Sequence, residues 1–92
     1  EKAVELFRKA AVMGNKDAQY DLGRALLWGF GCEKNPSEAL TWFRLAAAQG
    51  HTEAEYESGI AYATGRGCPT DLRQAQQRLT LFRSAAPKRH LP

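Results

Sequence analysis

Four side chains of this 92-residue chain could bind a metal ion or act as a nucleophile: His51, His90, Cys32 and Cys68. A zinc site needs Cys, His, Asp or Glu clustered at short spacings, and neither histidine belongs to such a cluster. A reactive thiol must be exposed beside a positive charge, whereas we predict that both cysteines are small buried apolar residues. The spacing therefore predicts no metal site, and we interpret His51 as a solvated loop residue.

The glycine pairs Gly29-x-Gly31 and Gly65-x-Gly67 could be mistaken for phosphate-binding loops. A dinucleotide fingerprint needs a third glycine three residues later, which both pairs lack, and no Walker lysine follows either pair. No serine begins the Ser-x-x-Lys motif of penicillin-interacting enzymes. We therefore interpret the glycine pairs as structural turns, and we predict no catalytic residue, no cofactor and no enzymatic activity.

The C-terminal end is basic, with Arg73, Arg78, Arg83, Lys88 and Arg89, and the chain has a net charge of +3. A five-residue spacing turns about 140° per step around a helix, so the three arginines before Lys88 do not share a face. A nucleic-acid-binding stripe needs a common face. Nucleic-acid binding is therefore kept only as an alternative function.

The glycines belong to a pattern that repeats every 36 residues, the spacing between Gly31 and Gly67. The residues that recur at this spacing are Ala3 and Ala39, Gly14 and Gly50, Ala18 and Ala54, Tyr20 and Tyr56, Gly23 and Gly59, Gly29 and Gly65, Gly31 and Gly67, and Cys32 and Cys68. A fixed period of this length is typical of stacked helical repeats. Equivalent positions in stacked helices lie about 8–10 Å apart, too far for a disulfide. Unpaired cysteines favour a reducing compartment such as the cytoplasm, with the periplasm open if a leader was removed.

Apolar spacing predicts five helices, over residues 1–13, 16–28, 36–49, 52–64 and 72–85. Asn15, Asn35 and Asp71 are predicted N-caps, and Thr52 begins a capping box. Gly23 and Gly59 fall inside helices, where glycine costs about 1 kcal/mol relative to alanine. We interpret them as points where two helix backbones approach closely.

The pattern Ala-x-Tyr-x-Leu-Gly, then Gly-x-Gly, Asp or Asn, Ala, Trp-Phe and Ala-Ala-x-x-Gly resembles the Sel1-like repeat, a relative of the tetratricopeptide repeat. In this chain its residues are Ala18, Tyr20, Leu22 and Gly23, Gly29 and Gly31, Asn35, Ala39, Trp42 and Phe43, Ala46, Ala47 and Gly50. The resemblance covers nearly the whole chain, and it implies an all-α right-handed superhelix. Departures are Ser58, where the repeat normally has leucine, and Arg78 and Leu79, which replace the Trp-Phe pair.

The period and the resemblance together divide the chain into about two and a half repeats. A half repeat spans 1–14, a full repeat spans 15–50, and a second spans 51–86 with a polar capping last helix. These form one solenoid over 1–86, and residues 87–92 are a loose tail after Pro87.

In Sel1-like arrays the first helix of each repeat lines a concave groove, so the resemblance implies a non-catalytic adaptor that binds a protein or peptide there. The implied contacts are Tyr20, Asp21, Arg24, Leu27, Trp28, Tyr56, Glu57, Ile60, Ala63 and Thr64. Arg24, Leu27 and Trp28 differ between the two repeats where architecture would keep them alike, and Trp and Arg dominate interface hot spots. An enzyme-associated module of the cell envelope is the other alternative.

Helix 1–13 has no preceding helix in this sequence to cover its apolar face. Because each repeat buries its apolar face against its neighbours, we expect either self-association through this helix or cover by another repeat. No apolar run approaches the roughly eighteen residues that a membrane span needs. The residues do not specify the partner.

Overall fold

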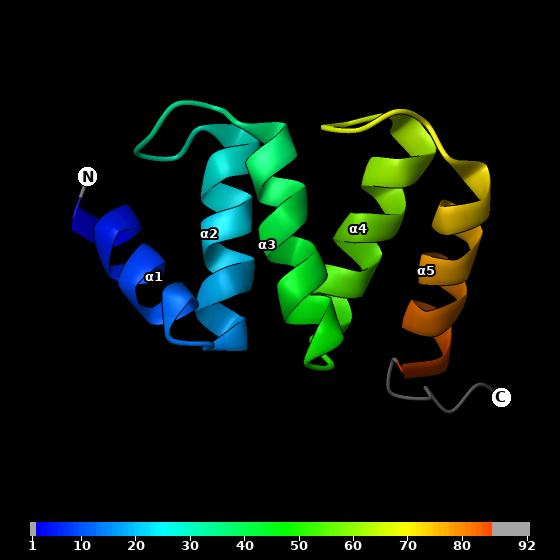
Figure 1. The fold of residues 1–92 in the computed structure, drawn as a ribbon, viewed down its shortest axis with the longest axis horizontal. Coiled ribbons are helices and arrows are strands. Elements are labelled where there is room, and N and C mark those ends of the chain that lie inside the picture. The colour runs from blue at the N-terminus through cyan, green and yellow to red at the C-terminus, as the bar shows by residue number, and fades with distance from the viewer. Residues whose placement is uncertain (1, 86–92) are drawn as a thin grey trace, which may run out of the picture.

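A computed structural model describes residues 2–85, which form five α-helices and no β-strand. The helices are α1 (Lys2–Val12), α2 (Lys16–Trp28), α3 (Pro36–Ala48), α4 (Thr52–Thr64) and α5 (Leu72–Ala85). Each helix packs on the next one along the chain (Figure 1). The expected all-α solenoid is confirmed, while Pro87, His90 and the predicted tail 87–92 lie outside the described residues.

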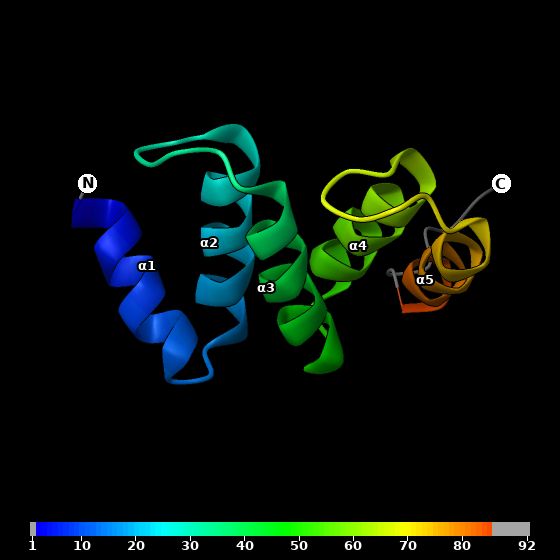
Figure 2. The same cartoon turned by 45° about the horizontal axis from the view of Figure 1, so that its top comes forward.

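The helices do not all run in one direction. Figure 2 shows α5 almost end-on while α1, α2 and α3 are still seen from the side. The core follows the line where consecutive helices meet, with Phe43 and Leu22 as its largest fully buried apolar side chains. Alanines such as Ala39 and Ala46 surround them, and these small side chains let the helices approach closely.

Side chains cap three helices as predicted. Asn15 Oδ1 accepts a hydrogen bond from the backbone N–H of Ala18 at 2.9 Å. Asn35 Oδ1 and Asp71 Oδ1 each accept one, at 3.1 Å, from the third residue of the helix that follows. The first N–H groups of a helix lack partners within it, so each cap satisfies one of them and defines where its helix begins.

The start of α4 differs from the prediction that Thr52 caps it. The N-cap is His51, whose Nδ1 accepts a hydrogen bond from the backbone N–H of Ala54 at 3.2 Å, and Thr52 is the first helical residue. His51 lies 36 residues after Asn15, the cap of α2. The repeat therefore keeps the cap at one position, and an imidazole nitrogen replaces an amide oxygen there.

Gly23 and Gly59 each face a large side chain of the following helix. A Cβ on Gly23 would lie 2.7 Å from a ring carbon of Phe43, and one on Gly59 would lie 2.8 Å from the Leu79 side chain. The prediction that two helix backbones approach each other at these glycines is therefore wrong, because each glycine lies against a side chain. The space left by each missing Cβ is filled by an apolar side chain.

The loop between α4 and α5 packs on the start of α3. Gly67 has a φ of +80°, and a Cβ there would overlap the carbonyl group of Pro36 and the nitrogen of Ser37. Glycine tolerates both the positive φ and the close approach. The loop of one repeat therefore rests directly on the backbone of the previous repeat.

Cys32 and Cys68 are free, but they are half-buried rather than fully buried as predicted. Each thiol donates a hydrogen bond to a carbonyl of the preceding helix, at 3.5 Å to Ala25 and 3.6 Å to Ala61. Burial raises the pKa of the Cys68 thiol, and the nearby charge of Asp71 raises it further. Cys68 therefore stays a neutral thiol near pH 7.

Ser58, which stands where the repeat normally has leucine, has a fully buried side chain. Its hydroxyl donates a hydrogen bond to the Ala54 carbonyl at 2.9 Å, so no buried polar atom is left without a partner there. The outer side of α5 is less polar than predicted, because Leu72 and Leu81 are exposed on it.

Candidate partner-binding face

Four of the predicted site residues come together between α2 and α4. The Arg24 guanidinium lies 5.9 Å from the centre of the Tyr20 ring. Burial raises the pKa of the Tyr20 hydroxyl, the Glu57 charge raises it further, and the Arg24 charge opposes both. Asp21 adds a smaller rise. We call Tyr20, Asp21, Arg24 and Glu57 the α2–α4 cluster.

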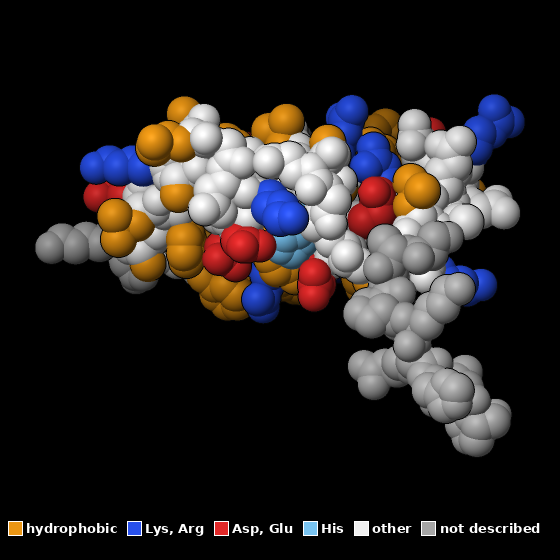
Figure 3. Space-filling view, turned by 90° about the horizontal axis from the view of Figure 1, so that it is seen from below, with side chains coloured by type: hydrophobic (Ala, Val, Ile, Leu, Met, Phe, Trp, Pro, Cys, Tyr) orange, Lys and Arg blue, Asp and Glu red, His pale blue; other side chains and the backbone are white. Residues whose placement is uncertain are grey.

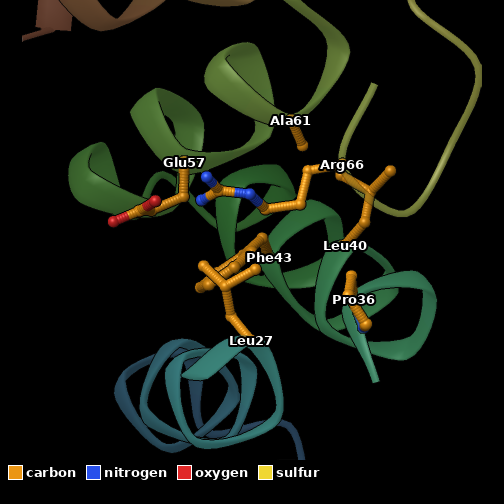
Figure 4. A pocket seen from close by; sticks show the side chains of 7 residues that line it. All are labelled: Leu27, Pro36, Leu40, Phe43, Glu57, Ala61 and Arg66. Atoms are coloured by element: carbon orange, nitrogen blue, oxygen red, sulfur yellow. The ribbon is translucent and has the colours of Figure 1, made fainter. Parts of the chain in front are cut away.

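Glu57 is the most unusual member of the α2–α4 cluster. Its carboxyl group is half-buried, and burial raises its pKa, while the charges of Arg24 and Arg66 act in the opposite direction. Figure 4 shows the Arg66 side chain extending toward Glu57. Within residues 2–85 the Glu57 carboxylate forms no hydrogen bond or ion pair. A partly desolvated acceptor is therefore left available on this face.

Trp28 ends α2 with its side chain 46% exposed. The Arg66 guanidinium lies 5.2 Å from the centre of its ring, a distance at which a cation and an aromatic face attract each other. Arg66 comes from the α4–α5 loop, so this contact joins one repeat to the next. One face of Trp28 is thus already occupied.

Leu27 was expected to be presented as an apolar anchor, and this is wrong. Its side chain is only 7% exposed and belongs to the core. It closes a pocket of about 10 Å³ that Phe43, Leu40, Ala61 and others also line (Figure 4). A pocket of this size holds about one water molecule, so it is no site for a small substrate.

The predicted residues of α4 beyond Glu57 do not join the α2–α4 cluster by any described contact. Tyr56 is exposed on one side and packs on the other against Phe82 of α5, with ring centres 5.0 Å apart. Thr64 donates its hydroxyl to the Ile60 carbonyl at 2.8 Å. Ile60 and Ala63 are half-buried. They offer a weakly apolar continuation of the face.

No cluster of three metal-binding side chains occurs in the described part of the chain. In the same residues, no helix has the length and apolar character needed to cross a membrane. What the face offers is a guanidinium, a half-buried carboxylate and aromatic rings, which are groups suited to recognising another surface.

The model of the Sel1 repeat matches residues 1–15, 16–51 and 52–77. The chain belongs to the Sel1 repeat family. Sel1 repeats are generally protein–protein interaction modules, and the fold is generally a non-catalytic scaffold. No curated protein matches the chain.

Two solved Sel1-type structures are similar to the chain over nine tenths of its length. A Sel1 repeat protein from Oxalobacter formigenes is 30% identical with a TM-score of 0.87, and the match covers 90% of this chain and 63% of that one. A protective antigen of uropathogenic Escherichia coli with an SLR fold is 39% identical with a TM-score of 0.84, and the match covers 91% and 20%. The chain therefore spans less than two thirds of either relative.

His51 is a structural residue of this Sel1-type chain rather than the solvated loop residue that we predicted. Its side chain is 11% exposed and stacks on the Tyr20 ring, with centres 4.5 Å apart. Its Nε2 lies 3.3 Å from Asp17 Oδ1. Figure 3 shows acidic and basic side chains gathered around histidine atoms, in pale blue, on this face of the molecule. The signal was available in the sequence, because His51 is one period from the cap Asn15.

Arg66 is a residue of this face that the sequence analysis did not select. It sits between Gly65 and Gly67, where only a turn was expected, and its side chain reaches back to Trp28 and toward Glu57. Its equivalent one period earlier is Phe30, so the position varies between repeats. The same variability that favoured Arg24 could have identified it.

The alternative functions find no support in this Sel1-type structure. Arg78, one of the basic residues considered for nucleic acid, is half-buried and forms an ion pair with Glu55 at 3.1 Å. Lys88 and Arg89 lie outside the described residues. Neither the family match nor the solved relatives indicates a cell-envelope enzyme.

Proposed function

We propose that this chain is a non-catalytic adaptor that binds a protein or peptide along the face built by α2 and α4. The α2–α4 cluster and the exposed side of Trp28 are the main contacts. Tyr56, Ile60, Ala63 and Thr64 extend the face along α4, and Leu27 supports it from below.

The observation that carries the proposal is that two charged groups of the α2–α4 cluster, the Arg24 guanidinium and the Glu57 carboxylate, have no ion-pair partner within residues 2–85. Among residues 2–85, Arg24 forms no ion pair and its guanidinium only faces the Tyr20 ring. Glu57 is half-buried and without a hydrogen-bond partner there. Burying a carboxylate without a partner costs free energy, and a bound donor recovers it.

The chemistry of the cluster describes the partner. Arg24 offers a forked donor that matches a carboxylate, and Glu57 accepts from a backbone N–H, a lysine or an arginine. The Tyr20 and Trp28 rings supply flat apolar area at low entropic cost. A peptide with an acidic residue followed by a donor and an apolar side chain fits this arrangement.

The test selects ligands for the native chain from a random peptide library displayed on phage, then measures their affinities by titration calorimetry. Arg24→Glu is expected to weaken the selected peptides at least tenfold, because truncation of a charged interface contact costs about 2 kcal/mol or more. Glu57→Gln should weaken them less, since the amide still accepts a hydrogen bond.

The control is Arg44→Glu, which makes the same charge change at an exposed position of α3. It should leave affinity within about twofold, because it lies outside the proposed face. Equal losses in Arg24→Glu and Arg44→Glu would contradict the proposal and indicate only a general effect of net charge. Circular dichroism confirms that each variant keeps its helices.

A further inference from the structure

Arg8, Glu38 and Trp42 join α1 to α3 through one carboxylate. Glu38 Oε2 accepts a hydrogen bond from the Arg8 guanidinium at 2.9 Å and another from the Trp42 indole N–H at 3.1 Å. The Trp42 ring is half-buried and packs against the core. We call these three residues the α1–α3 triad. Its arginine is neutralised by the carboxylate, and its aromatic ring covers apolar surface beside the ion pair.

The positions one period later, between α3 and α5, carry Arg44, Gln74 and Arg78. The carboxylate and the indole of the triad are both replaced there. Arg44 is exposed and forms no ion pair within residues 2–85. Arg78 is directed toward α4, where it pairs with Glu55 at 3.1 Å. Arg44 therefore keeps an unpaired charge, whereas its equivalent Arg8 is neutralised.

A hollow lies between α3 and α5 beside Arg78, the equivalent of Trp42. Its volume is about 420 Å³, and it is lined by Thr41, Arg44, Leu45, Ala48 and Arg78. Figures 1 and 2 show α4 between α3 and α5, so the two helices that flank the hollow stand apart. Leu45 is 45% exposed and occupies the position of Lys9 in α1. The hollow therefore combines exposed apolar surface with an unpaired guanidinium.

The nearby acidic residue, Asp71, does not neutralise Arg44. Burial raises the pKa of the Cys68 thiol, Asp71 raises it further, and Arg44 acts in the opposite direction, so both charges lie near this thiol. The Asp71 carboxylate caps α5 by accepting the backbone N–H of Gln74 at 3.1 Å, and in the described structure it forms no ion pair with Arg44. A guanidinium is a forked donor that matches a carboxylate, so Arg44 favours an acidic partner.

We propose that the hollow between α3 and α5 binds a helix of another protein, one that carries a glutamate and a tryptophan four residues apart. Its glutamate pairs with Arg44 as Glu38 pairs with Arg8, and its tryptophan ring covers Leu45 and Ala48. In α3 the same two residue types are four residues apart and bonded to each other. One face of a helix therefore presents both groups together. The partner supplies from outside what α5 lacks.

The chain does not supply this helix itself. Glu38 and Trp42 are its one pair of an acidic residue followed by an aromatic residue four positions later. Both already belong to the α1–α3 triad. Residues 86–92 contain two basic residues, Lys88 and Arg89, and no Asp or Glu, so their side-chain charges repel Arg44. The occupant is therefore a different protein.

The hollow is separate from the partner-binding face. None of its five lining residues belongs to the α2–α4 cluster or to the extension of that face along α4. Variants of Arg24 or Glu57 test the proposed adaptor face, whereas variants of Arg44 and Gln74 test the hollow. Failure at one surface would leave the other unaffected.

The test measures binding of a defined helical peptide to the whole chain. The probe is an alanine-based helix with one glutamate and one tryptophan four residues apart. A side-chain staple on its opposite face holds the helix, because short isolated helices are marginal in water. Fluorescence anisotropy of the labelled peptide gives the affinity. Chemical-shift changes are expected at Leu45 and Ala48 in NMR spectra of the isotope-labelled chain, which would place the peptide in the hollow.

Three matched peptides make the test specific. Glutamine in place of the glutamate keeps an acceptor but removes the charge, and it should weaken binding about tenfold. Alanine in place of the tryptophan should weaken binding at least tenfold, because a buried aromatic anchor is lost. An isomer with the two residues only two positions apart has the same composition but presents them on different faces of the helix, so it should also bind at least tenfold more weakly.

Three variants of the chain test the role of Arg44. Arg44→Gln should weaken the probe about tenfold and reduce the salt dependence of binding. Arg73→Gln is the matched control, because it removes the same charge from an exposed position of α5 that does not line the hollow, and affinity should stay within about twofold. Gln74→Glu places a carboxylate at the position of Glu38, so it should compete for Arg44 and weaken the probe several-fold. Circular dichroism should show unchanged helix content in all three.

Five results would overturn the proposal. These are no binding at millimolar peptide, shift changes away from the hollow, equal losses in Arg44→Gln and Arg73→Gln, equal affinity for the probe and its isomer, or binding of inorganic phosphate in the hollow as tight as that of the probe. Sedimentation that shows a dimer of the native chain, lost in Arg44→Gln, would also overturn it and identify a second copy as the occupant.

Discussion

The two complete repeats hold their second helices by different chemistry. In the first repeat the Phe43 ring fills the space over Gly23, and Gln19 accepts a hydrogen bond from Gln49. In the second repeat a smaller Leu79 lies over Gly59. Its polar contact is the ion pair of Arg78 with Glu55 at 3.1 Å, and Glu55 is the equivalent of Gln19.

The same backbone arrangement therefore accommodates two kinds of contact between the helices of a repeat. We call the α2–α3 contact the first joint and the α4–α5 contact the second joint. The first joint depends on aromatic volume and neutral amides, which respond little to salt. The second joint has a smaller side chain, Leu79, in place of the Phe43 ring, and it includes the Arg78–Glu55 ion pair. The Arg78 guanidinium also lies 6.0 Å from the centre of the Tyr62 ring. The second joint should therefore be weaker, and sensitive to ionic strength.

The largest effect is expected from removing the two apolar side chains. Phe43→Ala should lower the free energy of unfolding by about 3–5 kcal/mol, because the ring is fully buried. Leu79→Ala should cost about 2 kcal/mol, since Leu79 is only half-buried. Urea denaturation followed by circular dichroism measures both. Leu45→Ala, on the exposed side of α3, is the control, and equal costs at Phe43 and Leu79 would remove the proposed difference between the joints.

A smaller effect is expected from the ion pair. Glu55→Gln should destabilise the chain by about 1–2 kcal/mol, because both partners are largely shielded from water. High salt should reduce this loss only in part, because salt screens a shielded pair less than an exposed one, whereas the loss from Phe43→Ala should not shrink with salt. Glu53→Gln is the matched control, because Glu53 is exposed on the same helix and forms no ion pair with an arginine within residues 2–85. A salt-independent Glu55→Gln loss would mean that packing, not charge, holds α5.

The smallest effect is expected in the pH dependence of stability, to which one carboxyl group from each repeat contributes, Glu38 and Glu57. Hydrogen bonds from Trp42 and then Arg8 hold the pKa of Glu38 below its usual value. The folded state therefore binds this proton less tightly, and the stability that Glu38 contributes is lost as pH falls through its folded pKa. Burial raises the pKa of Glu57, so protonation in the window just above the usual glutamate pKa stabilises the fold.

Urea midpoints measured between pH 3 and 7 test these signs. Glu38→Gln should reduce the loss of stability toward acid, and Glu57→Gln should raise stability at neutral pH and remove the small gain on mild acidification. The opposite sign for Glu57→Gln would mean that the attraction of Arg24 and Arg66 outweighs the cost of burying the carboxylate.

The period of the sequence was enough to predict the fold, because Asn15, Asn35 and the glycine turns act locally and recur at fixed offsets. The start of α4 was misassigned because Thr52 fits a capping box by residue type, while His51 fits the cap by position. Position was the better guide here, since the loop before each first helix is the same length in both repeats.

The candidate site was harder to predict. Leu27 was placed on the wrong side because its burial depends on a pocket built by α3 and α4, which a helical projection of α2 alone cannot show. Arg66 was missed because its role depends on the path of a loop. Whether Arg24 and Glu57 are paired with oppositely charged side chains depends on which residues surround them in the folded chain, and the sequence alone does not show this.

The contact of Gly67 with the backbone of Pro36 has a consequence for how such arrays evolve. Backbone atoms keep their size whatever residue carries them, so the step and curvature from one repeat to the next rest on a contact that substitutions elsewhere cannot lengthen or shorten. Side chains along α2 and α4 can then diversify toward new partners while the superhelix keeps its pitch.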